Sequence, residues 1–319
     1  MIKQLTELRD GKYIQTSIKV GKEGSILSKR SKAEKVIFFI AFLIFLLYAA
    51  SLIAPFLFLF INSFKGGLEY INDANASNSM AFPDKWLFKN YLEAFTSMKM
   101  IDSFGNEIYL PTMLLNSLWY TFACVVCGVA ASTLTGYVLS KYKFKLRGFF
   151  YGIAIFSMTI PIIGSTGASF RLMTILGIYN TPLFPFLNNF AGFGFNFLIM
   201  YGFFTNLPWS YAEAVFIDGG GHSTAFFKVM LPQAWPPMLT LAIMAFIGAW
   251  NDYMTVLLYL PDFPTLASGI YRIQLSLTRD GNYPVYFAGL LVSTIPIIAL
   301  YGGFSNIIMQ NFTVGGLKG

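Results

Sequence analysis

The sequence has few charged residues, few cysteines and a single histidine. Charged residues occupy 12% of the 319 positions, which is about half of their usual share in soluble domains. Hydrophobic residues make up 55% of the chain and aromatic residues 18%, so the chain also lacks the polar composition of a disordered protein. These shortages exclude an ordinary soluble enzyme and favour one polytopic membrane domain.

The cysteines and the histidine offer little metal or redox chemistry. Cys124 and Cys127 have C-x-x-C spacing, but they lie inside an apolar run without a second pair, which favours packing within a helix. His222 has no neighbouring Cys or His, so we expect it to be solvated rather than catalytic or metal-binding. The sequence therefore predicts no catalytic residue, metal site or cofactor in this chain.

Motifs of nucleotide-binding and hydrolytic enzymes are also missing. The sequence contains no G-x-x-x-x-G-K-[ST], no H-E-x-x-H and no G-x-S-x-G, so any ATP hydrolysis must occur in a partner. Two alternatives to an ATP-driven transporter remain open. An intramembrane enzyme would need paired catalytic groups, and a secondary transporter or channel driven by an ion gradient would need charge pairs within the membrane or an inverted repeat.

Long apolar runs dominate what the sequence does contain. A helix needs about 20 mostly apolar residues to cross a bilayer, and six stretches meet this requirement. We therefore predict an all-α membrane protein with a bundle of six transmembrane helices. The predicted spans cover residues 36–61, 113–139, 149–170, 189–207, 236–260 and 285–310.

The distribution of Lys and Arg indicates the orientation of these spans. Nine of the 22 basic residues lie in the first 35 positions, and residues 140–148 carry four more without an acid. With both termini in the cytoplasm, inner segments hold fifteen basic residues and outer segments hold seven. The positive-inside rule favours this arrangement. It also accounts for the net charge of +7, so we expect no nucleic-acid partner.

These spans divide the chain into an arm, a transmembrane domain and a tail. We expect a cytoplasmic N-terminal arm, a six-span permease domain and a short cytoplasmic tail. Within the domain, long outer loops separate spans one and two and spans five and six, and an inner loop joins spans four and five. The ranges are 1–35 for the arm, 36–310 for the domain, 311–319 for the tail, 62–112 and 261–284 for the outer loops, and 208–232 for the inner loop.

The inner loop carries the most specific pattern in the chain. Ser210 and Glu213 have the spacing of a capping box, which predicts a short helix from about Tyr211. The glycine run 219–221 predicts a turn with left-handed dihedral angles. Ser223 would cap a second short helix that ends near Pro232. The result is a helix–turn–helix elbow with apolar residues on its outer faces, which is typical of a docking surface. These residues are Ala214, Val215, Ile217 and Phe226.

This loop resembles the EAA loop of the permease subunits of ATP-binding-cassette importers. In that family, Glu-Ala-Ala is followed after three residues by Gly, and nine residues later by Ile-x-Leu-Pro. Glu213-Ala214-Val215, Gly219 and residues 229–232 reproduce each spacing, with Val in place of one Ala and of the Ile. Gly220 and Gly221 stand where Ala-Ser is common. Shorter matches across residues 81–319 resemble the sugar-uptake branch, close to the six-span maltose-type permease subunit.

The resemblance implies a coupling role for the elbow. Its first helix would sit in a cleft of a separate cytoplasmic ATPase, and Glu213 would either contact that ATPase or serve mainly as a helix cap. The resemblance implies that ATP and Mg²⁺ are bound by two such ATPase subunits. The expected coupling residues are Glu213, Ala214, Val215, Ile217, Asp218, Gly219, Phe226, Leu231 and Pro232.

One intramembrane acid marks a second candidate site. Asp252 follows Trp250 and Asn251 in the apolar fifth span, and acids inside a membrane are functional hypotheses by default. Asp252 would accept hydrogen bonds from a sugar, and Trp250 would offer a flat apolar face; an interhelical hydrogen bond or an interfacial location is the alternative. Polar residues of the fourth span such as Asn196 would line the same pathway, with helix packing as the alternative.

The remaining expectations concern partners and location. The chain would be one half of a pore in the bacterial cytoplasmic membrane, in contact with lipid. Its partners would be a second, related permease, two ATPases and an extracellular or periplasmic solute-binding protein that delivers the sugar. We expect that protein to contact aromatic residues in the two outer loops, namely Trp86, Tyr91, Phe263 and Tyr271.

Overall fold

The computed structural model describes residues 3–9, 12–18, 32–159, 164–190, 192–277 and 281–314 of the chain. It divides into two compact units, residues 1–57 and residues 58–319. In the first unit, the strands β1 and β2 pair antiparallel, with Lys3 opposite Ile18. Helix α1 begins in this unit, and its apolar side chains are exposed along the part that the unit contains. The bounds are Lys3–Arg9 for β1, Lys12–Ile18 for β2 and Lys32–Ser63 for α1.

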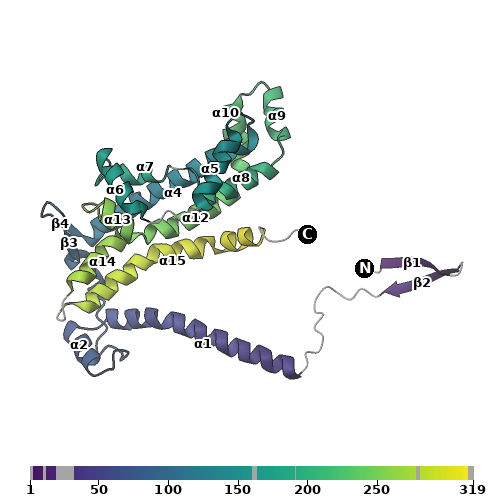
Figure 1. Cartoon of the computed structure of the whole chain (residues 1–319). Coiled ribbons are helices and arrows are strands. Elements are labelled where there is room, and N and C mark those ends of the chain that lie inside the picture. The colour runs from purple at the N-terminus through teal and green to yellow at the C-terminus, as the bar shows by residue number, and fades with distance from the viewer. Residues whose placement is uncertain are drawn as a thin grey trace. The chain divides into compact units, whose positions relative to one another are not determined.

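The second unit is a helical assembly with one small β-hairpin among its described residues (Figure 1). Its first part contains α2 (Gly67–Asn75), α3 (Lys89–Ser97), the hairpin strands β3 (Lys99–Ile101) and β4 (Glu107–Tyr109), α4 (Leu110–Lys141), α5 (Arg147–Thr159), α6 (Ser165–Ile175) and α7 (Phe184–Asn188). Its second part contains α8 (Phe195–Asn206), α9 (Ser210–Ile217), α10 (His222–Thr224), the π-helix η1 (Ala225–Met230), α11 (Leu231–Gln233), α12 (Trp235–Trp250), α13 (Tyr253–Tyr259), α14 (Leu266–Ser276) and α15 (Tyr283–Val314). The prediction of an all-α membrane architecture is therefore confirmed.

Among the described residues, three helices are long and apolar enough to cross a membrane by themselves. They are Ala33–Ser63, Leu110–Lys141 and Tyr283–Ser305, and they match the first, second and sixth predicted spans. A fourth candidate is the pair His222–Gln233 and Trp235–Trp250, which bends by 71° between its two helices. The six-span count therefore stays a prediction.

The third, fourth and fifth predicted spans are not single helices. In the third, α5 and α6 flank residues 160–163, which lie outside the described residues. The helix of the fourth begins only at Phe195. The fifth is interrupted at Asn251 and Asp252, where α12 ends and α13 starts. The prediction that Asp252 lies within an apolar helix is wrong, because Asp252 is the N-cap residue of α13.

Close contact between α4 and α8 organises the part of the second unit that contains residues 136–137 and 200–204. Gly136 on α4 permits this approach, because a Cβ atom there would lie 2.9 Å from Met200 Cβ and from the Tyr201 backbone nitrogen. Met200 and Phe204 of α8 are fully buried in the cluster that also contains Tyr137 of α4. Small residues allow membrane helices to pack at this distance.

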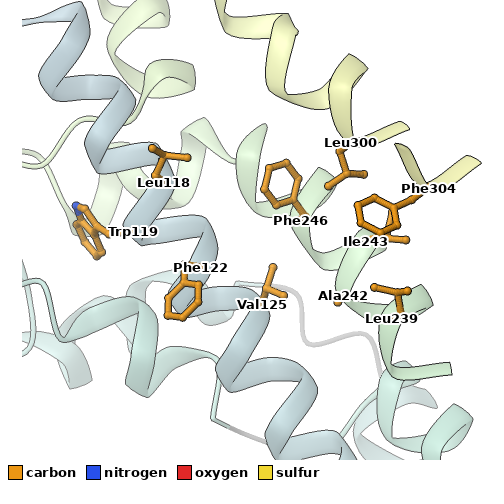
Figure 2. Close-up of a pocket in the computed structure, with 10 residues that line it drawn as sticks. All are labelled: Leu118, Trp119, Phe122, Val125, Leu239, Ala242, Ile243, Phe246, Leu300 and Phe304. Atoms are coloured by element: carbon orange, nitrogen blue, oxygen red, sulfur yellow. The ribbon is translucent and has the colours of Figure 1, made fainter. Parts of the chain in front are cut away.

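An apolar groove lies where α4, α12 and α15 diverge (Figure 2). Its volume is about 560 Å³. Apart from the indole N–H of Trp119, which donates to Asn116 Oδ1 at 3.1 Å, the lining side chains carry no polar atom. The groove therefore suits lipid chains or another apolar helix rather than a sugar. It is lined by Leu118, Trp119, Phe122, Val125, Leu239, Ala242, Ile243, Phe246, Leu300 and Phe304.

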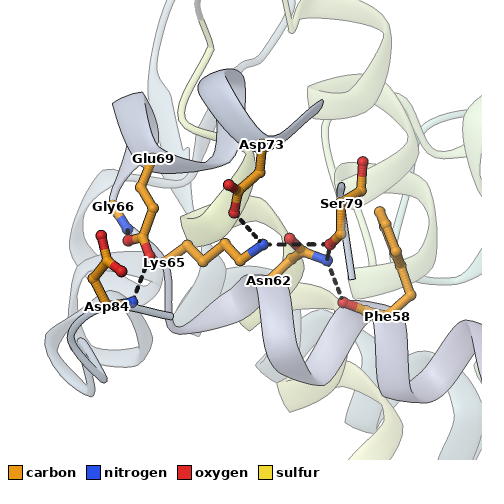
Figure 3. Close-up of polar contacts among 8 residues, drawn as sticks. All are labelled: Phe58, Asn62, Lys65, Gly66, Glu69, Asp73, Ser79 and Asp84. Carbon is orange, nitrogen blue, oxygen red and sulfur yellow. Dashed lines mark hydrogen bonds and ion pairs between the residues drawn. The ribbon is translucent and has the colours of Figure 1, made fainter. Parts of the chain in front are cut away.

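A buried lysine fixes the start of the first long loop (Figure 3). The Lys65 side chain is fully buried, and its Nζ lies 2.7 Å from Asp73 Oδ2, whose side chain is 24% exposed. Nζ also donates to the Ser79 carbonyl at 3.3 Å. Asn62 Nδ2 donates to the same carbonyl at 3.0 Å, and Asn90 Nδ2 donates to the Lys65 carbonyl at 2.9 Å. These bonds tie α2 and α3 to the end of α1.

We expect Gly136→Ala to weaken the contact between α4 and α8. The added methyl group has no room beside Met200 and Tyr201, and overpacking of this kind costs about 1–3 kcal/mol. The thermal unfolding midpoint of the detergent-purified transporter should fall. Gly152→Ala on α5 is the matched control, since a Cβ atom there meets no heavy atom within 4 Å. Equal midpoints for the two variants would contradict this account.

We expect the two halves of the Lys65–Asp73 pair to be unequal. Asp73→Asn leaves a fully buried cation without its counter-charge and should cost about 3–5 kcal/mol. Lys65→Met leaves a carboxylate that retains access to water, so its cost should be smaller. Thermal unfolding of both variants checks this order. A larger loss for Lys65→Met would show that the packing of the lysine stem matters more than its charge.

Candidate functional site

The elbow between α8 and α12 is the first candidate site, and a tight turn defines its shape. Helix α9 ends at Ile217, and Gly219 adopts a left-handed φ of +81°. The Gly219 amide donates to the Phe216 carbonyl at 3.1 Å, and the Gly220 amide donates to the Val215 carbonyl at 2.8 Å. This pair of bonds is a Schellman motif. The predicted left-handed glycine turn is therefore confirmed.

The predicted side-chain caps of the elbow do not form. Helix α9 starts at Ser210, with Trp209 at its N-cap and no side-chain cap bond, so the capping box of Ser210 and Glu213 is wrong. The Trp209 carbonyl instead accepts from the Glu213 amide at 3.2 Å. The second helical run starts at His222 with Gly221 as N-cap, again without a side-chain bond, so Ser223 is not a cap. The run passes through Pro232 and ends at Gln233.

Aromatic rings attach the elbow to the end of α4. The Tyr142 hydroxyl and His222 Nδ1 are 3.0 Å apart, and the Tyr142 ring also meets Trp209 edge to face. The Lys141 ammonium donates to the Leu207 carbonyl. The Tyr137 ring lies 4.7 Å from that of Phe226. His222 is exposed, as expected, but it bridges the elbow and α4 rather than contacting solvent alone.

The expected coupling residues fall into an exposed set and a packed set. Glu213, Ala214, Asp218, Gly219 and Pro232 are exposed, and Ile217 has 85% of its surface exposed. Val215 and Leu231 are half-buried, and Phe226 is buried in the cluster around Tyr137. The prediction that Phe226 lies on the exposed outer face is therefore wrong, because its ring packs on Tyr137 of α4. The exposed set is available to a partner, whereas the packed set holds the elbow against α4 and α8.

The second candidate site is a polar cavity beside the gap between α12 and α13. It has two lobes of about 250 Å³ and 280 Å³ that share Gly128, Asn188, Asn189 and Asn196. Asp252 lies in the first lobe. The residues of the first lobe are Tyr120, Cys124, Gly128, Asn188, Asn189, Asn196, Ala245, Gly248, Ala249, Asp252 and Thr255. The second lobe adds Ser132, Gly192, Phe193 and Phe195.

The Asp252 carboxylate lies at the interruption between α12 and α13 and bonds to both α13 and α4. Its Oδ1 accepts from the Thr255 amide at 3.0 Å, which caps α13. Its Oδ2 accepts from the Tyr120 hydroxyl at 3.1 Å. Asn189 Nδ2 donates to Cys124 Sγ at 3.2 Å. Both carboxylate oxygens are thus bonded to neutral groups, and the cavity brings Asp252 and Asn196 together.

The other two residues expected in the pathway lie elsewhere. Trp250 is buried, its ring stacks on Phe246 at 5.5 Å, and its indole donates to the Ser293 carbonyl at 3.1 Å. Asn251 is exposed, and its amide donates to Ile247 one turn back. Neither residue lines the two lobes.

Sequence reasoning missed the wall that α4 contributes to this cavity. Tyr120, Cys124, Gly128 and Ser132 all line it. They recur every four residues, a spacing that places side chains along one face of a helix. This stripe of small and polar residues within an apolar helix was the available signal.

The four aromatic residues expected at the outer surface differ in exposure. Trp86 is 45% exposed. Tyr91, Phe263 and Tyr271 are half-buried: Tyr91 lies 2.9 Å from the Ser63 hydroxyl, Phe263 packs on Trp119, and Tyr271 packs on Tyr253. The more exposed apolar residues near Trp86 in the sequence were not anticipated; they are Leu68, Phe82, Phe88 and Leu92.

Asp262 connects its own loop to two other segments, the β3–β4 hairpin and the segment after α6. Its carboxylate accepts from the Ser103 amide at 2.8 Å in the β3–β4 hairpin and from Asn180 Nδ2 after α6. Burial raises the pKa of this carboxyl, but the hydrogen bonds from Ser103 and Asn180 and the nearby Arg272 outweigh it, so its pKa is below the ordinary value. The bonds therefore persist at neutral pH and weaken only as acid protonates Asp262.

Comparison with known proteins connects these sites to transport. The diacetylchitobiose uptake system permease protein NgcG of Streptomyces coelicolor is 28% identical over 273 residues, covering 85% of each chain. The arabinooligosaccharides transport system permease protein AraQ of Halalkalibacterium halodurans is 29% identical over 269 residues, covering 83% of this chain and 91% of the relative. A bacterial ABC transporter involved in the import of the acidic polysaccharide alginate has a similar fold. Its matched chain has a TM-score of 0.72 at 21% identity, covering 87% of this chain and 98% of that one.

Residues 125–313 match the family described as binding-protein-dependent transport system inner membrane component. The match includes both the elbow and most of the cavity wall. It excludes the intramembrane enzyme and the ion-driven transporter as alternatives. With the apolar helices and the elbow, it identifies the chain as a member of this family of membrane permeases, and so as a multi-pass transport component and not an enzyme.

Proposed function

We propose that this chain is one of two permease subunits of an ATP-binding-cassette importer that carries a sugar or oligosaccharide into a bacterial cell. The names of its relatives NgcG and AraQ, which refer to sugar uptake, support the substrate class. The elbow carries the proposal. A short helix closed by a glycine turn exposes Ile217 in a chain that has no nucleotide-binding motif of its own.

In this proposal, the exposed face of α9 sits in a cleft of a cytoplasmic ATPase subunit. ATP and Mg²⁺ are bound by the two ATPases, and their closure moves the elbow. Helix α8 moves with the elbow because it is joined to α9 through Leu207. Helix α4 moves with the elbow because Tyr142 bonds to His222 and Lys141 bonds to the Leu207 carbonyl. Rigid movement of these helices then changes access to the polar cavity.

The proposed pathway includes the cavity that holds Asp252 and Asn196. The amides of Asn188 and Asn196 make no side-chain hydrogen bond within the described part of the chain, and each offers both donors and an acceptor to a sugar hydroxyl. A second permease subunit, related to this one, would complete the pore. Trp250 and Asn251, which point elsewhere, would support the shape of α12 instead of touching the solute.

The outer side of the pore would receive the solute-binding protein. We place both termini and the elbow in the cytoplasm, from the distribution of basic residues. The segments 62–112 and 261–284 then face outward, and Trp86 with its exposed neighbours Phe82 and Phe88 would form the contact. Tyr91, Phe263 and Tyr271 would shape that surface from beneath.

We expect Ile217→Asp to release the ATPase. Ile217 is 85% exposed, so the fold should hardly change, but a carboxylate in an apolar interface should lower affinity by about 2 kcal/mol or more. Recovery of the ATPase with affinity-purified permease should therefore fall sharply. Leu68→Asp is the matched control, because Leu68 is 80% exposed on α2. Full recovery with Ile217→Asp would refute the role assigned to the elbow.

We expect Gly220→Ala to distort the turn, and Val215→Ala to relieve part of the strain. A Cβ atom at position 220 would lie 2.5 Å from Val215 Cγ1 and 2.9 Å from the Val215 carbonyl oxygen. The single change should cost about 1–3 kcal/mol, and the double variant should recover the share caused by the valine side chain. Thermal unfolding of the purified transporter provides the measurement.

The control for this pair is Gly221→Ala. A Cβ atom there meets no heavy atom within 4 Å, and the residue has a negative φ of −93°. The control should unfold like the unmodified protein. Additive effects of Val215→Ala and Gly220→Ala would mean that the two side chains do not compete for one space.

A further inference from the structure

We infer that Asp252 gives the polar cavity a negative charge that favours uncharged or cationic sugars and excludes anionic ones. The inference rests on the proposed function of this cavity as the solute pathway. Among the described residues that line the two lobes, Asp252 is the one charged side chain, and none is Lys, Arg or His. The rest of the polar lining consists of hydroxyl, thiol and amide groups.

The immediate partners of Asp252 leave its charge in place. The Tyr120 hydroxyl and the Thr255 amide donate to its two oxygens at 3.1 Å and 3.0 Å. Both donors are neutral, so they stabilise the carboxylate without cancelling it. Tyr120 belongs to α4 and Asp252 to the gap between α12 and α13. The charge is therefore fixed between two packed elements and does not swing away from the cavity.

The fixed charge discriminates between solutes in two ways. Like charges repel strongly where water is scarce, so a sugar carboxylate or sulfonate in the same lobe is disfavoured. Such a group also has only acceptor oxygens, as Asp252 has, so the two cannot share a hydrogen bond. A sugar hydroxyl or ammonium group instead donates to Asp252, while Asn188 and Asn196 offer further donors and acceptors. Neutral sugars and amino sugars fit this lining.

The chain contains its own reporter of this charge. Cys124 lines the same lobe as Asp252, and Cys127 is the one other cysteine in the sequence. Methanethiosulfonate reagents transfer their thioalkyl group to a thiolate, which forms a disulfide and releases methanesulfinate. A trimethylammonioethyl reagent and a sulfonatoethyl reagent perform the same reaction with opposite charges. The ratio of the cationic to the anionic reaction rate at Cys124 is divided by the same ratio for free 2-mercaptoethanol. This normalised rate ratio reports the local electrostatic potential.

The experiment uses the assembled transporter in membrane vesicles, and the intact mass of this chain is followed in a Cys127→Ala variant. We expect the normalised rate ratio to favour the cationic reagent by about tenfold. Asp252→Asn should bring the ratio close to one. Asparagine has nearly the same shape and is also a good N-cap residue, so the helix break should persist. Asp84→Asn, an exposed acid in the outer loop, is the control for loss of one charge and should leave the ratio unchanged.

A second reporter covers the case in which Cys124 is too enclosed to react. Gly128 lines both lobes, and a Cβ atom there meets no heavy atom within 4 Å. Gly128→Cys in a chain with Cys124→Ala and Cys127→Ala should show the same charge preference. If neither position reacts with either reagent, the cavity admits no solute and the inference is overturned.

The remaining outcomes separate the inference from the proposed function. A ratio that Asp252→Asn does not change, or a preference for the anionic reagent, refutes the charge selection. If the ATPase still copurifies in that case, the proposed importer stands and only its selectivity is wrong. If no ATPase copurifies with the unmodified chain, the proposed function fails, and the inference about a transported sugar fails with it.

Discussion

An interrupted helix must satisfy the backbone amides at its new end, and Asp252 does so for the Thr255 amide of α13. The α12 helix ends at Trp250, and the next begins three residues later because the carboxylate of Asp252 accepts from the Thr255 amide. The same carboxylate is held by Tyr120 from α4. The interruption thus places a polar group where an uninterrupted apolar helix would have none. The cap therefore supplies the carboxylate of the first lobe, next to the polar residues that α4, α7 and α8 contribute.

The sequence was informative where a pattern reflects a local requirement. Apolar runs predicted α1, α4 and α15, because length and hydropathy alone decide whether a helix can span a bilayer. The glycine run predicted the turn of the elbow, because Gly219 needs a left-handed φ that other residues seldom adopt. The exposure of Ile217 was also predicted, but Phe226, predicted on the same outer face, is buried against α4.

Predictions failed where several solutions were locally possible. Hydropathy predicted one helix across residues 251–252, because two polar residues hardly change the mean hydropathy of a long apolar window. Ser210 and Glu213 had capping-box spacing, but tertiary packing of Trp209 against Tyr142 extends the helix by one residue and leaves no place for the cap. Cavity residues on α4 were missed because their partners come from segments more than 60 residues away, as with Cys124 and Asn189.

The departures from the EAA pattern also make sense together. Val215 is larger than the alanine usual in the family, and Gly220 is smaller than the alanine common at its position. In the structure the Val215 side chain lies next to Gly220, so a methyl group at position 220 would have no room. The two departures are therefore sterically compatible, because a glycine at position 220 leaves room for the Val215 side chain.

The unbroken course of α4 has a mechanical consequence. Tyr120 holds Asp252 at the cavity, and Tyr137 packs on Phe226 at the elbow. The seventeen residue-to-residue steps from Tyr120 to Tyr137 span about 25 Å along a straight helix. A tilt of α4 by about 3° would displace one end by roughly 1 Å relative to the other, which is enough to separate the two oxygen atoms that join Tyr120 and Asp252. In the proposed importer, a rigid α4 would therefore carry a movement of the elbow to the hydrogen bond at the cavity.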